Sequence, residues 1–277
     1  MTNTVIVSLV SMGAMGVLFG AGLAWASRKF AVESDSRIDE IEAALPGANC
    51  GACGYPGCRA FAESVVGGGA PVNGCPVGGT AVATQVAKIM GVEPEDSGER
   101  LVARVHCGGG HAQAKQRADY VGIDDCRAAI MVGGGAKGCE YGCLGLASCV
   151  RACPFDAMVM GDNGLPIVDK DRCTACGRCV VACPRDLITL VPCSKEVHVL
   201  CRSFDRGREV RDNCQVGCIG CKACERVCEY DAIHVTDFLA AIDYAKCTNC
   251  GACAAKCPTK AIIIENGQIQ LAETTAS

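Results

Sequence analysis

The sequence predicts an α+β protein that begins with one membrane-spanning helix and continues as small cysteine-rich units. Three observations support this prediction. An uncharged apolar segment lies near the N-terminus, 25 of the 277 residues are cysteines in short repeated groups, and aromatic residues make up only 4% of the chain. Units with so few large apolar side chains usually need metals or disulfides to stay folded. We therefore expect the cysteines to determine the fold.

The N-terminal segment 5–26 contains no charged residue, and its 22 residues are enough to span a bilayer. Arg28 and Lys29 follow it directly, so the positive-inside rule places the rest of the chain on the cytoplasmic side. A cleaved signal peptide is the alternative, but the segment lacks a basic n-region and is longer than a usual h-region. We expect residues 1–30 to be a retained, single-pass anchor in the cell (inner) membrane.

The cysteine spacing favours metal ligation over disulfides. Clustered C-x2-C pairs are typical of metal sites, and an odd number of cysteines cannot all form disulfides within the chain. Thiols that bind metal need a reducing compartment such as the cytosol. The net charge of −4 indicates no nucleic-acid partner, and the four histidines are too scattered to form a site.

The next unit, residues 31–95, carries cysteines with the spacing C-x2-C-x4-C-x16-C. They are Cys50, Cys53, Cys58 and Cys75. Glycines between the first three allow the backbone to pass close to a metal cluster. The segment 59–66 has helical character and would return Cys75 to the same site. We expect one [4Fe-4S] cluster here, with a four-thiolate zinc site as the alternative.

A C-x2-C-x2-C-x3-C-P run near the C-terminus has the spacing of bacterial ferredoxins, in which the fourth cysteine ligates a second cluster. The run is Cys247, Cys250, Cys253 and Cys257 before Pro258, and its partner run is Cys218, Cys221, Cys224 and Cys228. Residues 193–277 are therefore expected to be a ferredoxin unit with two [4Fe-4S] clusters. Crossed ligation groups Cys218, Cys221 and Cys224 with Cys257, and groups Cys247, Cys250 and Cys253 with Cys228.

The same cysteine pattern occurs earlier in the chain, displaced by 74 or 75 residues. We therefore expect a first ferredoxin unit in residues 96–192, in tandem with the second. One of its clusters would use Cys173, Cys176, Cys179 and Cys153. Leu146 occupies the position equivalent to Cys221, so the other cluster would use Cys139, Cys143, Cys149 and Cys183. This substitution leaves open whether Cys214, the counterpart of Cys139, competes with Cys221 in the second unit.

Short apolar runs follow the cysteine motifs and are rich in β-branched residues, which suits short strands. They lie at 157–160, 187–191, 232–235 and 261–264. Together with intervening helices they predict compact α+β units.

Five clusters account for 20 cysteines and leave five others, namely Cys107, Cys126, Cys193, Cys201 and Cys214. One interpretation is a sixth cluster formed across the repeats by Cys107, Cys126, Cys193 and Cys201, with Cys214 left over. The alternative is that these are free buried thiols or a redox pair. We expect five [4Fe-4S] clusters, and a count of iron atoms would decide whether there are six.

The motif N-C-G-x-C-G-Y-P-G-C at 49–58, the sequence C-P-V-G-G at 75–79 and the duplicated ferredoxin units resemble the iron–sulfur B-subunit family of Rnf electron-transport complexes. The resemblance covers nearly the whole chain. It implies a relay that takes electrons from soluble ferredoxin and passes them to other subunits of the complex. In that family the complex reduces NAD+ and pumps sodium ions or protons.

The sequence also indicates what this chain lacks. No G-x-G-x-x-G unit follows a predicted strand, so a nicotinamide site is not expected here. The single apolar segment contains no charged residue and offers no ion pathway. If the resemblance holds, NAD+ reduction and ion pumping belong to other subunits.

Overall fold

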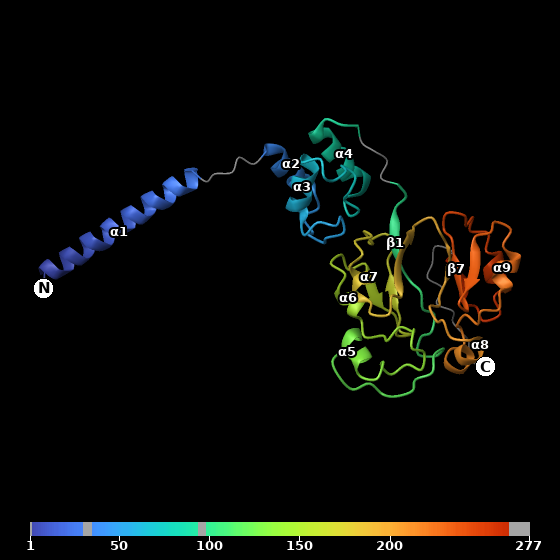
Figure 1. Ribbon diagram of the computed structural model, residues 1–277. Helices are drawn as coiled ribbons and strands as arrows, with labels where there is room; N and C mark the ends of the chain where they lie inside the picture. Colours follow the sequence, from blue (N-terminus) through green and yellow to red (C-terminus); the bar gives the residue numbers. More distant parts are fainter. Residues whose placement is uncertain (1, 30–34, 94–97, 266–277) are drawn as a thin grey trace.

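The structure is a computed structural model that describes residues 2–29, 35–93 and 98–265 (Figure 1). The expected boundaries near residues 30, 95 and 277 therefore lie at or outside the edges of the described residues. Along the described chain, one long helix comes first, a three-helix module follows, and short strands and helices make up the rest.

The first helix, α1, spans Thr2–Lys29. Among the described residues it contains the one stretch, Leu9–Lys29, that is long and apolar enough to cross a membrane. No part of this stretch is buried against the rest of the described chain. At its C-terminal end the Lys29 ammonium lies 4.9 Å from the centre of the Trp25 ring. The expected apolar segment is thus an exposed helix with a cationic end.

The N-terminal module packs three helices around a small apolar core. The helices are α2 (Ser36–Ala44), α3 (Cys58–Val66) and α4 (Gly79–Met90). Ile41, Phe61 and Val86 fill the space between them and are almost fully buried. The expected helix at 59–66 is therefore present. Because α3 begins at Cys58, the core holds this cysteine beside the loop that carries Cys50 and Cys53.

Residues 98–192, here called unit 1, contain two antiparallel strand pairs. In one pair, β1 (Leu101–Val105) lies beside β4 (Ile188–Pro192), and in the other, β2 (Met158–Met160) lies beside β3 (Pro166–Val168). The short helices are α5 (Cys126–Met131), α6 (Ser148–Arg151) and α7 (Arg178–Ala182). Val102, Ile188 and Val191 form the apolar core together with the thiols of Cys149 and Cys179.

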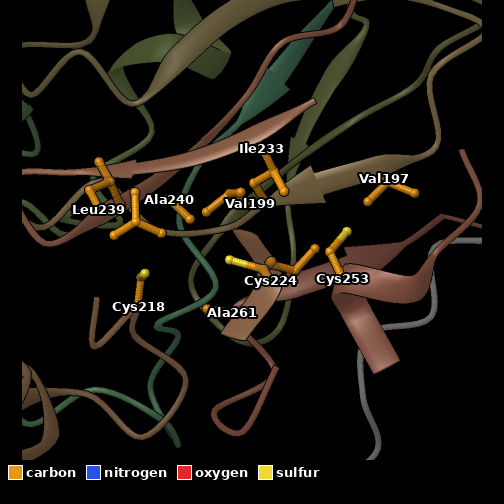
Figure 2. Packing of buried hydrophobic residues seen from close by; sticks show 11 residues of the cluster. Val197, Val199, Cys218, Cys224, Ile233, Leu239, Ala240, Cys253 and Ala261 are labelled. Atoms are coloured by element: carbon orange, nitrogen blue, oxygen red, sulfur yellow. The ribbon is translucent and has the colours of Figure 1, made fainter. Parts of the chain in front are cut away.

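Residues 193–265, here called unit 2, repeat this arrangement. In one pair, β5 (Val197–Val199) lies beside β8 (Ile262–Ile264), and in the other, β6 (Ile233–Thr236) lies beside β7 (Leu239–Ile242). Its helices are α8 (Gly207–Asn213), α9 (Ala223–Val227) and α10 (Ala252–Lys256). Figure 2 shows cysteine thiols and apolar side chains packed together in this core. The strands expected at 157–160, 187–191, 232–235 and 261–264 are present to within two residues.

The two units join along the ends of β1 and β5. The Gly108 amide donates to the Leu200 carbonyl at 2.9 Å, and His106 Nδ1 donates to the Val199 carbonyl at 2.9 Å. Burial lowers the pKa of His106, so its ring stays neutral, and its Nε2 accepts from the Thr189 hydroxyl. These contacts hold the residues around Cys107 close to those around Cys201.

A buried ion cluster holds the other end of the same interface. The Glu265 carboxylate accepts from the Arg104 guanidinium and lies 2.5 Å from the Lys170 ammonium. Arg104 and Lys170 belong to unit 1, whereas Glu265 directly follows β8 of unit 2. Tyr244 of unit 2 also packs against the core of unit 1 and donates to His198. Both polar and apolar contacts therefore connect the units.

Candidate iron–sulfur sites

Two four-cysteine groups that spacing predicts each line one cavity. In unit 1 a cavity is lined by Cys153, Cys173, Cys176 and Cys179, here called site B. In unit 2 a cavity is lined by Cys228, Cys247, Cys250 and Cys253, here called site F. In each case the structure brings together a three-cysteine loop and one cysteine from the partner run.

The second cavity of unit 1 differs from the group that spacing predicts. This cavity is lined by Cys126, Cys143, Cys149 and Cys183, here called site C. Cys126 stands where Cys139 was expected. The reason lies in helix α5, which begins at Cys126 after the capping residue Asp125. The Cys126 amide donates to Ser148 Oγ at 2.8 Å, so α5 sits beside the helix that carries Cys149.

Another cavity lies between the two units. It is lined by Cys107, Cys139, Cys201 and Cys214, here called site D. Each unit contributes one cysteine that follows its first strand and one that lies four residues before Cys143 or Cys218. A two-residue bridge pairs Ala114 with Cys214, and the Lys115 amide donates to the Asn213 carbonyl at 2.9 Å. These contacts close the cavity from the side of α8.

Site D also differs from the sixth group expected from the sequence. That group contained Cys126 and Cys193, and the cavity contains Cys139 and Cys214 in their place. Cys193 packs against the core of unit 1, and its amide donates to the Arg100 carbonyl at 2.8 Å. Because Cys193 directly follows β4, the strand pairing holds it away from the interface cavity.

The cysteines of the two remaining predicted groups pack in the apolar cores of unit 2 and of the N-terminal module, respectively. Cys218, Cys224 and Cys257 pack in the core of unit 2, and Cys221 is close enough to Cys224 to influence it electrostatically; these four form site E. Cys53, Cys58 and Cys75 pack against the core of the N-terminal module, and Cys50 and Cys53 act electrostatically on Cys75. This last group, Cys50, Cys53, Cys58 and Cys75, is site A. Gly51 and Gly54 have φ of 76° and 85°, a conformation that glycine adopts easily.

Two cations compensate the thiolates between sites C and D. Lys137 is only 6% exposed, and its Nζ donates to the Gly109 carbonyl at 2.6 Å. The Arg185 guanidinium donates to the Cys139 carbonyl at 2.9 Å and interacts electrostatically with the nearby thiols. Burial lowers the pKa of Arg185, and these thiols act in the opposite direction. Positive charge beside clustered thiolates reduces their mutual repulsion.

The donor sets fit iron–sulfur clusters better than single ions. Four sulfurs around one zinc ion each lie about 2.3 Å from the metal, which leaves no cavity between them. Among the described residues, no group of three or more His, Cys, Asp or Glu side chains is arranged to hold a single metal ion. The cysteines instead line cavities, as ligands placed around the outside of a cube would.

Backbone amides point at several of the thiols. The amides of Ala103, Leu187 and Ala232 lie 3.4 Å from the sulfurs of Cys173, Cys183 and Cys228, respectively. Hydrogen bonds of this kind stabilise a thiolate and tune the potential of the cluster that it holds.

Burial raises the pKa of several thiols. It is the main reason why the pKa values of Cys143, Cys149, Cys179 and Cys201 are raised to about 12. Free thiols at these positions would stay protonated at neutral pH, and metal binding would release the protons.

Cavities lined by four cysteines, on short hairpins and helices, define this chain as an iron–sulfur protein built from ferredoxin-type folds. Family models agree in three places. Residues 45–77 match the family described as "Putative Fe-S cluster", residues 166–189 match "4Fe-4S binding domain", and residues 217–261 match "4Fe-4S dicluster domain".

Curated relatives identify the particular family. The chain is 48% identical over its whole length to the B subunit of the Na(+)-translocating ferredoxin:NAD(+) oxidoreductase complex of Acetobacterium woodii, covering 82% of that protein. It is 49% identical, over 95% of this chain and 99% of the relative, to the B subunit of the ion-translocating oxidoreductase complex of Methanosarcina acetivorans. The corresponding Vibrio cholerae protein is 35% identical over 61% of this chain and 73% of its own length. The chain belongs to the B-subunit family of ion-translocating oxidoreductase (Rnf) complexes.

Proposed function

We propose that this chain is the membrane-anchored electron-relay subunit of an ion-translocating ferredoxin:NAD+ oxidoreductase. It accepts electrons from reduced ferredoxin and passes them to other subunits of the complex. The names of the relatives support this function. The structural observation that carries it is the set of cavities that are each lined by four cysteines. When bound, [4Fe-4S] clusters supply one-electron transfer.

These four cavities, together with the two cysteine groups packed in the cores at sites A and E, support six clusters, held by sites A to F. This grouping uses every cysteine except Cys193. It also explains why Leu146 can stand in place of a cysteine, since Leu146 lines the cavity of site C and Cys126 supplies the missing thiol. The question of whether Cys214 competes with Cys221 has a simple answer in this grouping. Cys214 belongs to site D and Cys221 belongs to site E.

Four parts of the chain have separate roles in this proposal. Residues 1–30 anchor the protein, and residues 31–95 hold site A. Residues 96–192 and 193–277 are tandem ferredoxin units that hold sites B and C and sites E and F, with site D shared between them. The exposed apolar helix α1, which ends in Arg28 and Lys29, supports a single membrane span with the clusters on the cytoplasmic side.

NAD+ reduction and ion transport belong to other subunits in this proposal. The run G-G-G-A-K-G at 133–138 is rich in glycine like a nucleotide loop, but it follows helix α5 instead of a strand. Arg117 and Arg185 both donate to carbonyls of this run, which makes it a support for sites C and D. Helix α1 carries no charge before Arg28, so it offers no polar path for an ion.

Anaerobic titration of the full-length chain in detergent tests the proposal. Reduced ferredoxin should bleach the visible absorption of the clusters, with about six electrons taken up per chain, one for each [4Fe-4S] cluster. Re-oxidation should restore the colour. A colourless protein, or one whose colour ferredoxin leaves unchanged while dithionite bleaches it, would refute the role as acceptor of ferredoxin electrons.

A further inference from the structure

We propose that sites B to F form a single unbranched path in the order B, C, D, E, F, in which site D connects the two ferredoxin units and electrons enter at the E–F end. This inference rests on the proposed electron-relay function and adds the order and direction of the relay. The contacts between neighbouring sites carry it, one link at a time.

Within each unit, single short helices connect two sites. Helix α7 carries Cys179 of site B, and Cys183 of site C follows it directly. Helix α6 carries Cys149 of site C, and Cys153 of site B follows one turn later. In unit 2, α9 and α10 link sites E and F in the same way. Contacts between α6 and α7, and between α9 and α10, keep each pair of sites together.

Site D contacts both units. On the side of unit 1, the Cys143 amide of site C donates to Cys107 Sγ of site D at 3.4 Å. On the side of unit 2, Cys201 of site D packs against the core cluster that contains Cys218 and Cys224 of site E. The same spacing of four residues then separates Cys139 from Cys143 and Cys214 from Cys218.

Two features of this arrangement make site D a bridge. The cavity lies between the units, and it is connected to site C by an amide-to-sulfur hydrogen bond and to site E by the packing of Cys201 against the core of unit 2. Electron tunnelling slows steeply with distance, so the shortest route between units passes through the site that both units share. Without a cluster in site D, electrons would have to cross directly from site E to site C.

Exposure determines the end at which electrons enter. Cys221 of site E and Cys250 of site F are exposed, whereas the other 23 cysteines are buried or half-buried. A soluble donor can approach a cluster most closely where a ligand reaches the surface. Electrons from ferredoxin therefore enter unit 2 and cross site D into unit 1.

The test removes site D and keeps the other five sites. The full-length variant Cys139→Ala/Cys214→Ala loses one ligand from each unit, and Cys193→Ala is the matched control because that thiol lies in no site. Rapid mixing with reduced ferredoxin, followed by freeze-quench electron paramagnetic resonance, counts the clusters that are reduced. Dithionite titration of the same samples counts the clusters that are loaded.

We expect ferredoxin to reduce the two clusters of unit 2 at the normal rate in the site D variant and the two clusters of unit 1 at least tenfold more slowly. The control should show the clusters of both units reduced together. Normal rates for the clusters of both units in the site D variant would overturn the bridging role of site D. If dithionite but not ferredoxin reduces the control, the proposed function fails, whatever the order of the sites.

A second pair of variants tests the direction without touching any ligand. Lys222 is exposed next to Cys221, and Lys88 is exposed on α4 of the N-terminal module. Lys222→Glu should slow reduction by an acidic ferredoxin at least threefold at low salt, and Lys88→Glu should leave the rate unchanged. The opposite result, with Lys88→Glu the slower variant, would place the donor at site A and overturn the proposed direction.

Discussion

The buried ion cluster at Glu265 makes a quantitative prediction about the interface between the two units. The side chains of Glu265 and Arg104 are only 10% and 12% exposed, and Lys170 approaches the same carboxylate. Replacing Glu265 by glutamine removes the negative charge and leaves two cations facing each other. We expect this single change to destabilise the folded protein strongly, because a buried pair that loses one partner leaves an uncompensated charge.

The pKa of Glu265 gives the magnitude. Burial alone would raise it, but hydrogen bonds from Arg104 and Lys170 outweigh burial and lower it from 4.5 to about 2. This difference corresponds to about 3 kcal/mol of stability at neutral pH. Because the folded-state pKa is the lower one, the contribution is fully present above pH 4.5 and is lost as the pH falls towards 2. Between pH 6 and pH 8 the contribution should therefore stay constant.

Thermal unfolding under argon, followed by loss of the visible cluster absorption, measures the effect. For a domain of this size, about 3 kcal/mol corresponds to an apparent Tm lower by roughly 6–12 °C. Asp231→Asn is the matched control, since the side chains of Asp231 and its ion-pair partner Lys246 are 71% and 50% exposed, and solvent screens such a pair. Equal Tm values for Glu265→Gln and the wild type would refute the reasoning. So would an equal decrease in Tm for Glu265→Gln and for the control Asp231→Asn.

Three further predictions concern the ligands and the anchor. Cys193→Ser should keep about 24 iron atoms per chain, whereas Cys126→Ser should lose iron from one four-iron cluster. Chemical analysis measures the iron content, and equal values for the two variants would contradict the ligand sets of sites C and D. In the wild type, the Cys58 amide donates to Asn49 Oδ1 at 2.8 Å, and Asn49→Ala removes this acceptor. Site A should therefore lose iron to a chelator several-fold faster, and an unchanged rate of iron loss would contradict this role. Deleting residues 1–30 should move the protein from the membrane to the soluble fraction on ultracentrifugation, and continued sedimentation with membranes would show that another part binds them.

Local spacing predicted much of this architecture. A C-x2-C-x2-C loop carries three of its cysteines close together in the sequence. The groups in sites B and F could therefore be proposed without any tertiary information. The short strands were also predictable, because β-branched runs such as 187–191 and 261–264 directly follow the cysteine motifs. The N-terminal apolar helix was equally clear from the absence of charge between residues 5 and 26.

The cysteines that line the cavities of sites C and D could not be predicted in this way. Aligning the repeats by a constant displacement equates Cys126 with Cys201, whereas the strand pairing makes Cys107 the counterpart of Cys201. Each of these two cysteines stands two residues beyond the first strand of its unit. A comparison of the strands, in addition to the cysteines, would have detected this equivalence. The position of α5 beside α6, which brings Cys126 to site C, depends on a tertiary hydrogen bond that no local pattern reveals.

The most direct test of the six sites and of the path through the two units is the iron anomalous-scattering map of anaerobically prepared protein. Six four-iron peaks are expected, one of them between Cys107 and Cys139 of unit 1 and Cys201 and Cys214 of unit 2. The peaks of sites B to F should follow one another in a single file from unit 1 to unit 2. Five peaks with none at the interface between the units would contradict both the ligand grouping and the order of electron transfer.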